Sequence, residues 1–259
     1  MMNAFDFLAP ERSFKPRSNG ITMILDKGLG LKTAEDIMNI SGDYVDFLKF
    51  GWGTITIHNK KIIEDKIEMC RSYGVDAYPG GTLFEIAYLQ NKIPEYFEEA
   101  SALGFKVLEI SDGSTMLPIE KRLSYISEAK NKGFKVISEV GKKDPKEDLK
   151  LTLENRVNLI KKDLDAGAYK VLIEARESGQ NIGIFDKNGN AKEDEVDYLL
   201  NKLPSDKIIW EAPKKSQQVY LILKIGYDVN LGNIPPEETT SLETIRRGLR
   251  GDTLGKVNL

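Results

Sequence analysis

The stretch "KVLEISDGSTMLPIEKRLSYISEAKNKGFKVISEVGKK", residues 106–143, contains two short apolar runs separated by one amphipathic segment. The runs KVLEIS (106–111) and FKVISEV (134–140) have the length and the β-branched content of buried strands. Between them, apolar residues recur at the spacing of one helix face: Ile119, Leu123, Ile126 and Ala129. Strand, helix and strand in this order predict one parallel βαβ unit.

The same alternation extends over the whole chain, with short β-branched or aromatic runs between longer amphipathic stretches. We expect eight strands, at residues 21–25, 44–50, 75–78, 106–111, 134–140, 169–175, 207–212 and 228–234. Eight strands that alternate with helices predict a (β/α)8 TIM barrel of the α/β class. An open doubly wound sheet is the structural alternative, but no Gly-x-Gly-x-x-Gly turn follows the first strand.

The length of 259 residues agrees with a single barrel domain, because α/β barrels often reach about 250 residues. We expect this domain over residues 20–259, after an irregular N-terminal arm over residues 1–19. No break in composition and no low-complexity segment marks a second domain.

The charge of the chain is nearly balanced, with 37 basic and 40 acidic residues and a net charge of -3. This balance gives no reason to expect nucleic acid or an anionic membrane as the main partner. No apolar run approaches the roughly 18 residues of a membrane span, and the N-terminus lacks the apolar core of a signal peptide. The single Cys70 cannot form an internal disulfide, so we expect a buried structural thiol in a reducing cytoplasm.

Four consecutive predicted strands carry a glutamate near their ends, in VLEISDG, VISEVGKK, VLIEARESG and IIWEAP. These residues are Glu109, Glu139, Glu174 and Glu211, and their spacings of 30, 35 and 37 residues each correspond to one βα unit. One strand residue has an even chance of pointing into a barrel, but four acids at comparable depth predict a shared site. Barrel enzymes keep their catalytic groups at this end of the strands.

Buried carboxylates need partners, because an unpaired buried charge costs several kcal/mol. Nearby cations could pair with the acids or hold an anionic substrate; they are Lys27, Lys49, Lys142, Lys143 and Arg176. With one histidine, His58, and no cysteine pair, a zinc site of His and Cys is excluded. Carboxylate oxygens suit Mg²⁺, and we expect His58 to be structural or solvent-facing.

Two segments are candidates for phosphate binding. One is NLGNI (230–234) with the basic stretch SLETIRRGLRGD (241–252), because the loops after the last two strands often form the phosphate site of barrels. The candidate residues there are Asn230, Arg247 and Arg250. The other is YPGGTLFE (78–85), where two glycines lead into a helix with free N–H groups. A simple turn and a basic helix end with salt bridges are the open alternatives.

Ten segments together resemble one family, phosphosulfolactate synthase, also named coenzyme M synthesis protein A. They are LDKGL (25–29), GDYVDFLKFGWGT (42–54), YPGGTLFE (78–85), LEISDGS (108–114), SEVGKK (138–143), EARESG (174–179), FDKNG (185–189), WEAPKKSQQ (210–218), VNLGNI (229–234) and SLETIRRGLRGDT (241–253). They span nearly the whole chain, and the second and last are long and specific. The chain departs from the pattern at Gly232, where we expect alanine, and in a longer N-terminal arm.

The resemblance implies a carbon–sulfur lyase with a (β/α)8 fold that adds sulfite to phosphoenolpyruvate. The implied reaction depends on Mg²⁺, passes through a metal-stabilised enolate and gives 2-phospho-3-sulfolactate. The resemblance also implies a homo-oligomer, a trimer with active sites near subunit interfaces. The sequence leaves open whether the product feeds coenzyme M biosynthesis or a sulfolactate pool.

Under this resemblance we assign catalytic roles to three lysines, Lys143, Lys142 and Lys49. Lys143 would be the general acid that protonates C2, if neighbouring charges and burial bring its pKa toward neutrality. Lys142 would bind anionic oxygens or pack outside the site.

We assign the remaining roles in the same way. The candidate Mg²⁺ ligands are Glu109, Glu139 and Glu174, with Asp26 and Asp112 in reserve. The candidates for holding sulfite or the substrate carboxylate are Lys27, Lys49 and Arg176. The candidates for the phosphate, or for an interface salt bridge, are Asn230, Arg247 and Arg250.

Two other functions remain possible at this point. A Schiff-base aldolase would use a lysine nucleophile, for which Lys49 and Lys170 are the candidates. A catalytically inactive relative would act as a binding or stress-associated module, and the loss of lysines or strand-end acids would mark it. The sequence retains both groups of residues.

Overall fold

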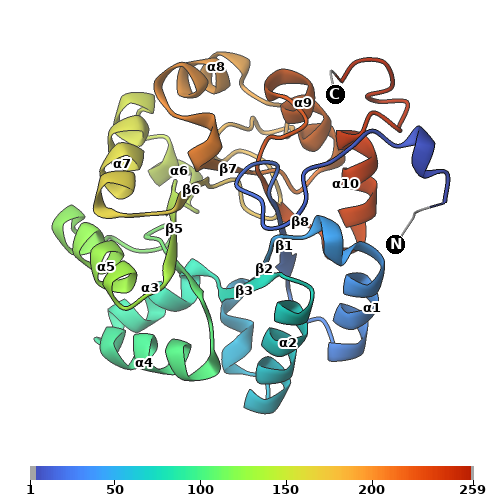
Figure 1. Ribbon diagram of the computed structural model, residues 1–259. Helices are drawn as coiled ribbons and strands as arrows, with labels where there is room; N and C mark the ends of the chain where they lie inside the picture. Colours follow the sequence, from blue (N-terminus) through green and yellow to red (C-terminus); the bar gives the residue numbers. More distant parts are fainter. Residues whose placement is uncertain (1–3, 258–259) are drawn as a thin grey trace.

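The computed structural model describes residues 4–257, in which eight strands form a central barrel surrounded by helices (Figure 1). The strands are β1 (Thr22–Asp26), β2 (Phe47–Phe50), β3 (Asp76–Pro79), β4 (Val107–Ile110), β5 (Lys135–Val140), β6 (Lys170–Ile173), β7 (Ile208–Glu211) and β8 (Leu231–Ile234). Each overlaps one of the predicted ranges, so the prediction of eight strands is confirmed.

Helices connect consecutive strands, and a last helix follows β8. They are α1 (Leu31–Ser41), α2 (Lys60–Ser72), α3 (Gly81–Leu89), α4 (Ile93–Leu103), α5 (Ile119–Asn131), α6 (Pro145–Asp148), α7 (Leu153–Ala166), α8 (Glu193–Lys202), α9 (Lys215–Ile225) and α10 (Thr239–Arg246). Short 3-10 turns are η1 (Asp6–Leu8), η2 (Gly42–Tyr44), η3 (Gly51–Thr56), η4 (Ser205–Lys207) and η5 (Pro236–Glu238).

All ladders between the strands are parallel, and they join the strands in the order β3-β2-β1-β8-β7-β6-β5-β4. The first and last strands of this order, β3 and β4, pack against each other, which closes the sheet into a nearly complete barrel. The predicted (β/α)8 TIM barrel is therefore confirmed, and the open doubly wound alternative is wrong.

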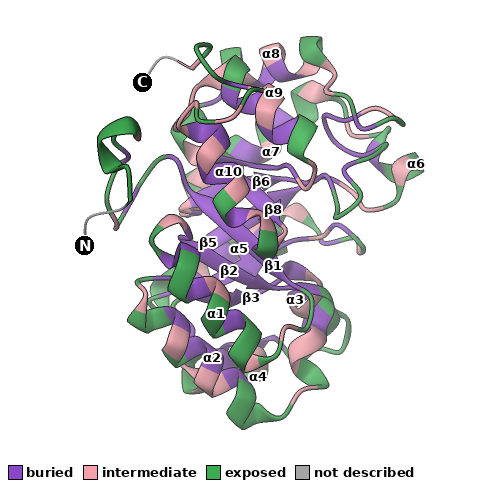
Figure 2. Cartoon of the chain, turned by 90° about the vertical axis from the view of Figure 1, so that its right-hand side faces the viewer, coloured by how far each residue is buried: buried purple, intermediate pink, exposed green. Residues whose placement is uncertain are grey.

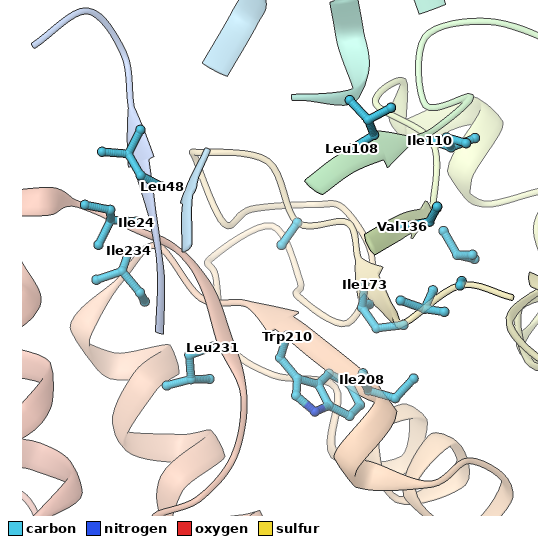
Figure 3. Close-up of a cluster of buried hydrophobic side chains, with 14 of the residues drawn as sticks. Ile24, Leu48, Leu108, Ile110, Val136, Ile173, Ile208, Trp210, Leu231 and Ile234 are labelled. Atoms are coloured by element: carbon cyan, nitrogen blue, oxygen red, sulfur yellow. The ribbon is translucent and has the colours of Figure 1, made fainter. Parts of the chain in front are cut away.

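Side chains that point outward from the strands form the core between the barrel and its helices. Figure 3 labels part of this cluster: Ile24, Leu48, Leu108, Ile110, Val136, Ile173, Ile208, Trp210, Leu231 and Ile234. Ile126 of α5 and Ile160 of α7 pack into the same cluster and are fully buried. The outer face of each strand packs on helices and the inner face packs inside the barrel, so the strands are apolar on both sides.

Side chains that point inward form a second, separate apolar cluster. Its members are Ile21, Met23, Phe47, Tyr78, Val107, Ile137, Leu172 and Ile209. Two residues further along four of these strands stand the glutamates of the sequence pattern, as the pairs Val107–Glu109, Ile137–Glu139, Leu172–Glu174 and Ile209–Glu211. Since strand side chains alternate with a period of two, the acids form the next inward layer, toward the carboxyl ends.

Gly232 of β8 leaves space for a side chain in the inner apolar layer. A Cβ at this position would lie 2.8 Å from the Cε atom of Met23 and 3.1 Å from the Cγ2 atom of Ile209. The Met23 side chain fills the space that the side chain of the expected alanine would take, so glycine fits at position 232.

The N-terminal arm crosses the amino-terminal end of the barrel. Lys170, the first residue of β6, donates to the carbonyl oxygen of Ser18 at 2.8 Å, and Arg12 forms an ion pair with Asp228 at 3.0 Å. Figure 2 shows the arm and α6 on opposite sides of the barrel. The arm therefore covers the end of the barrel away from the glutamate layer, and the boundary at residue 19 stays a prediction.

Cys70 of α2 is buried and forms no disulfide, as the sequence predicted. Burial raises the pKa of its thiol to about 12. Among the described residues, no helix is long and apolar enough to cross a membrane.

The inner apolar layer gives a first prediction. Ile137→Ala should lower the free energy of unfolding by about 2–5 kcal/mol, because the fully buried side chain leaves a cavity inside the barrel. Chemical denaturation measures this change, with Leu149→Ala as the control because Leu149 is 81% exposed. Equal effects of the two variants would contradict a packed inner layer.

Candidate active site

A cavity of about 120 Å³ lies at the carboxyl ends of the strands, directly above the inner apolar layer. All eight strands, or the loops that follow them, contribute to its lining. The lining residues are Leu25, Lys49, Gly51, Trp52, Gly80, Gly81, Thr82, Glu109, Glu139, Lys143, Glu174, Arg176, Glu177, Glu211 and Asn233. The structure thus brings the four strand-end glutamates into one site.

Lys49 is the cation that lies deepest among these acids. Its Nζ atom is 3.0 Å from Glu109 Oε2, 3.3 Å from Glu139 Oε2 and 3.5 Å from Glu211 Oε1. Burial disfavours its charge, but the three carboxylates outweigh burial and raise the pKa of Lys49 well above its ordinary value. A Cβ at Gly80 would lie 3.1 Å from Lys49 Cε, so this glycine leaves room for the lysine side chain.

Glu109 has partners for both of its oxygens. Oε1 accepts a hydrogen bond of 2.7 Å from the backbone N–H of Gly81, and Oε2 faces Lys49. Burial raises the pKa of Glu109 to about 7, although Lys49 favours the ionised form. Oε1 is therefore occupied at the start of α3, whereas Oε2 is buried and forms an ion pair with Lys49 at 3.0 Å without accepting a hydrogen bond.

Glu139, Glu174 and Glu211 form a cluster in which one oxygen of each lies within 4.8 Å of the others. Burial alone would raise the pKa of Glu139, but the charges of Lys143 and Lys49 outweigh burial and lower it to about 2. Burial, followed by the charges of Glu139 and Glu211, raises the pKa of Glu174 well above its ordinary value. Three carboxylates this close together repel one another, and the repulsion favours binding of a cation.

Two oxygens of this cluster, Glu139 Oε1 and Glu174 Oε2, are buried without a hydrogen-bond partner among the described residues. Buried carboxylate oxygens with open lone pairs are the ligand type that a hard divalent cation prefers. The cluster therefore fits Mg²⁺. It contains two of the three predicted metal residues, with Glu211 in the place of Glu109.

Lys143 lies beside this cluster, at the side of the cavity. Its Nζ atom donates to Thr82 Oγ1 at 3.0 Å and lies 3.7 Å from Glu85 Oε1 and 3.8 Å from Glu139 Oε1. Burial favours the neutral amine, but Glu139, Glu174 and Glu85 outweigh burial and raise the pKa of Lys143. The near-neutral pKa that was named from the sequence as a condition for general-acid catalysis by Lys143 is therefore not found in this arrangement.

Comparison with known proteins identifies the family. Residues 10–252 match the family described as (2R)-phospho-3-sulfolactate synthase (ComA). The chain belongs to this family. It is 64% identical over 258 residues to the phosphosulfolactate synthase of Methanothermobacter thermautotrophicus, with 100% of both chains covered. It is 51% identical over 256 residues to that of Methanocaldococcus jannaschii, with 99% of this chain and 100% of the relative covered.

A solved structure of 3-hexulose-6-phosphate synthase from Salmonella typhimurium has a similar fold, with a TM-score of 0.57 and 16% identity. The match covers 87% of this chain and 98% of that one. At this identity the likeness concerns the barrel alone, whereas membership of the phosphosulfolactate synthase family rests on the sequence matches.

Lys142, which precedes Lys143, points away from the acidic cavity. Its Nζ atom donates to Asp112 Oδ2 at 2.6 Å and to the carbonyl oxygens of Asp112 and Thr115. It lines a wider outer cleft of about 960 Å³, which Lys143 and Arg176 also line. The two adjacent lysines therefore point in different directions, and Lys143 is the one that reaches the acids.

Arg176 and Lys27 lie at the rim of the cavity. Arg176 is exposed, has a positive φ of 58°, and donates its backbone N–H to Glu174 Oε1 at 2.6 Å. Lys27 is exposed and lies 5.5 Å from the centroid of the Trp52 ring, and Trp52 lines the cavity. The Arg176 guanidinium donates to the carbonyl oxygen of Lys143 at 3.2 Å and lines the outer cleft.

The predicted phosphate residues do not gather at the cavity. Asn230 Oδ1 accepts from the backbone N–H of Ile21 and its Nδ2 donates to Ile208 O, at the amino-terminal end of the strands. Arg247 lies at the same end, beside Tyr44 and the carbonyl oxygen of Pro10. The substrate-binding prediction places these residues wrongly, because the strand and helix directions carry them to the other end of the barrel.

Arg250 also lies outside the cavity lining, where it pairs with Ser241 and with Asp252 at 3.6 Å. The loop after β8 begins with Pro235 and Pro236, which have no N–H groups to offer a phosphate. The start of α3, where Thr82 lines the cavity, is the better-placed of the two predicted phosphate segments.

Glu211 and Asn233 are two polar cavity residues to which no individual role was assigned from the sequence. Glu211 follows the same pattern of apolar residue, spacer and glutamate as its three neighbours, so the signal was present in the sequence. Asn233 has a positive φ of 54°, and its Oδ1 atom is buried without a hydrogen-bond partner. Only the fold shows that Asn233, three residues after Asn230, reaches the carboxyl-end layer.

The reserve acids and the rival nucleophile have other partners. Asp26 pairs with Lys66 and accepts the backbone N–H groups of Gly28 and Leu29. Asp112 pairs with Arg122 and Lys142. Lys170 has its pKa lowered to about 8 by burial but lies under the N-terminal arm, away from the cavity.

His58 lines a different cavity, of about 290 Å³, between η3, α2 and α4. This cavity is mainly apolar and contains none of the strand-end glutamates. His58 is half-buried and lies outside the acidic site, which agrees with the expectation of a structural or solvent-facing histidine.

The charge balance of the site gives a second prediction. Lys49→Met should lower the free energy of unfolding by about 3–5 kcal/mol near pH 8 without divalent cation, because three buried carboxylates lose their counter-ion. The loss should shrink near pH 6. Without Lys49 the folded-state pKa values of the glutamates rise, and a raised carboxyl pKa makes the folded state less stable as pH increases.

Denaturant unfolding at both pH values measures this effect. Lys150→Met is the control, since Lys150 forms an exposed ion pair with Glu147. A loss for Lys49→Met that is no larger than the control, or that grows as pH falls, would contradict the proposed charge balance.

Proposed function

We propose that this chain catalyses the Mg²⁺-dependent addition of sulfite to phosphoenolpyruvate, which gives 2-phospho-3-sulfolactate. The observation that carries the proposal is the buried cluster of Glu139, Glu174 and Glu211 with Lys143 beside it, in a member of the phosphosulfolactate synthase family. The relatives' name supplies the reaction, and the site offers a divalent-cation cluster next to a candidate proton donor.

The reaction adds sulfite without a leaving group. The sulfur lone pair forms a bond to C3 of phosphoenolpyruvate, and the electrons of the C2–C3 double bond move to C2 and into the carboxylate. C2 then takes one proton, so the product contains substrate, sulfite and one proton. No covalent enzyme intermediate is required, and a Ser–His or Cys–His pair is unnecessary for this chemistry.

Glu139, Glu174 and Glu211 would hold the Mg²⁺ ion. When bound, the ion supplies positive charge for the negative charge that builds up on the substrate. Lys49 lowers the electrostatic cost of burying these acids, because its ammonium group lies within 3.5 Å of Glu109, Glu139 and Glu211. Its contacts with three carboxylates make charge balance a better role for Lys49 than direct binding of sulfite.

Lys143 would donate the proton to C2. Its raised pKa keeps the side chain as an ammonium at neutral pH, which is the form that a general acid needs. Glu139 and Glu174 contribute to this raised pKa and also belong to the cation cluster, so cation binding would weaken their hold on the proton. Binding of the cation would thus lower the pKa of Lys143 and make its proton easier to transfer.

The substrate anions would be held where the cavity opens to the outer cleft. Lys143 and Arg176 line both spaces, and Lys27 lies beside Trp52 at the rim. The start of α3 adds the N-terminal end of a helix dipole near Thr82, and Asn233 adds a side-chain amide on the other side. These groups are suited to the phosphate, carboxylate and sulfite charges.

The rival functions fit the site less well. Lys49 is held as an ammonium by three carboxylates, so it is a poor Schiff-base nucleophile, and Lys170 lies at the other end of the barrel. An inactive relative has no need for the buried charges that this site retains. A homotrimer, a cytoplasmic location and the pathway that uses the product stay predictions.

The central test is an assay of sulfite-dependent consumption of phosphoenolpyruvate. Activity should require Mg²⁺ and disappear with a chelator. No sulfite-dependent consumption by the intact protein, with Mg²⁺ in excess, would refute the proposed function.

The adjacent lysines give a third prediction. Lys143→Met should lower kcat by about 10²–10⁴-fold, because it removes the general acid. Lys142→Met is the matched control and should keep kcat within about tenfold of the unchanged protein, because Lys142 contacts Asp112 outside the cavity. Equal losses for the two variants would contradict the assignment of Lys143.

The acids give a fourth prediction, on binding of the metal. Glu211→Gln should weaken Mg²⁺ binding by more than about tenfold, because it removes one carboxylate of the cluster. Glu109→Gln should weaken it less, since Glu109 instead contacts Lys49 and Gly81. Calorimetric titration without substrate measures both affinities, and the reverse order would show that the cation uses Glu109.

A further inference from the structure

Glu85 is a buried acid next to the site that the roles above leave unassigned. It belongs to α3, one turn after Thr82, and is 2% exposed. Its Oε1 atom accepts a hydrogen bond of 2.6 Å from Ser111 Oγ and lies 3.7 Å from Lys143 Nζ. Its Oε2 atom accepts the backbone N–H of Ser114 at 2.7 Å.

Lys143 is enclosed from several directions. Thr82 Oγ1 and Glu85 Oε1 approach its ammonium group from the same face of α3, because they are three residues apart in the helix. The backbone N–H of Lys143 donates to Gly113 O at 2.9 Å, and a Cβ at Gly113 would lie 3.2 Å from Lys143 Cε. The loop before α5 therefore fits closely along the lysine side chain, and Glu85 anchors that loop at Ser114.

Three carboxylates act on the ammonium group of Lys143, and they differ in what else they do. Glu139 and Glu174 belong to the cluster that fits the divalent cation. Glu85 lies outside that cluster, and its other hydrogen bonds are to neutral groups of the Ser111–Ser114 loop. When a cation occupies the cluster, Glu85 is the carboxylate near Lys143 whose charge is not shared with the metal.

We propose that Glu85 is a positioning residue, which with Thr82 holds the Lys143 ammonium at the cavity wall where it can reach the reacting carbon. The inference rests on the proposed function and adds to it the group that aims the proton donor. Glu85 contacts neither the cavity nor the cluster, so it acts through Lys143. A general acid displaced by about 1 Å can lose 10²-fold in rate, so such a residue matters for turnover.

A double-mutant cycle tests the proposal in the sulfite-addition assay. Glu85→Gln keeps the shape of the side chain and removes its charge, and it should lower kcat by about 10–100-fold while the KM for phosphoenolpyruvate changes by less than about threefold. In the Lys143→Met background, Glu85→Gln should change kcat by less than about twofold. An equal fold loss in both backgrounds would overturn the proposal, because Glu85 would then act by another route.

Two controls separate positioning from support of the fold. Ser111→Ala removes the hydroxyl that donates to Glu85 and keeps the carboxylate, so kcat should stay within about threefold of the unchanged protein. A loss as large as that of Glu85→Gln would make Glu85 an anchor of the loop only. Glu243→Gln removes a buried acid paired with Arg12 and Arg247 at the other end of the barrel, and it should leave kcat unchanged.

A structural readout keeps the proposal separate from the proposed function. In a crystal structure of Glu85→Gln, Lys143 Nζ should lie away from Thr82 Oγ1, to which it is bonded at 3.0 Å in the unchanged chain. An unmoved lysine would overturn the positioning role even if the chain has another activity. If Glu85→Gln does not fold, Glu85→Asp serves the same cycle, since it keeps the charge and withdraws the carboxylate by one methylene.

Discussion

Four carboxylates buried in one layer of a barrel require compensating positive charge, and the rest of the site depends on how that charge is supplied. Lys49 provides one charge from below and contacts Glu109, Glu139 and Glu211. Lys143 adds a second charge 3.8 Å from Glu139, yet burial, together with the neighbouring carboxylates, still raises the pKa values of Glu109, Glu174 and Glu211. The layer of acids is therefore suited to a further source of positive charge beyond the two lysines, which a divalent cation would supply.

The barrel was predictable from eight strands that alternate with helices, and the acidic layer from a local pattern repeated in four of them. In V-x-E, I-x-E, L-x-E and I-x-E, the period of two places an apolar residue and then an acid on the same inward face. The pattern repeats once per βα unit, so it indicated that the acids gather at the carboxyl end of the barrel. Glu211 belongs to this pattern as fully as Glu139, and choosing three of the four as metal residues lost information that the sequence contained.

The end of the barrel at which a polar residue lies was harder to predict. Asn230 and Asn233 are three residues apart, yet the first bonds to backbone at the amino-terminal end and the second reaches the cavity. Arg247 follows a helix that runs back along the barrel, so its position depends on the length of α10. Such placements are fixed by strand register and helix length, which short motifs do not encode.

The two lysines of ISEVGKK show how the fold divides one motif into two environments. Gly141 has a φ of 142° and lies against Glu174, where a Cβ would come within 2.5 Å of the Glu174 side chain, so the chain turns there without a side chain of its own. After this turn Lys142 pairs with Asp112 and Lys143 meets α3. A neutral partner such as Thr82 fixes the direction of an ammonium group, and a carboxylate such as Glu85 fixes its charge. Under the proposed mechanism the proton donor would need both kinds of partner, because its other carboxylate neighbours would be shared with the cation.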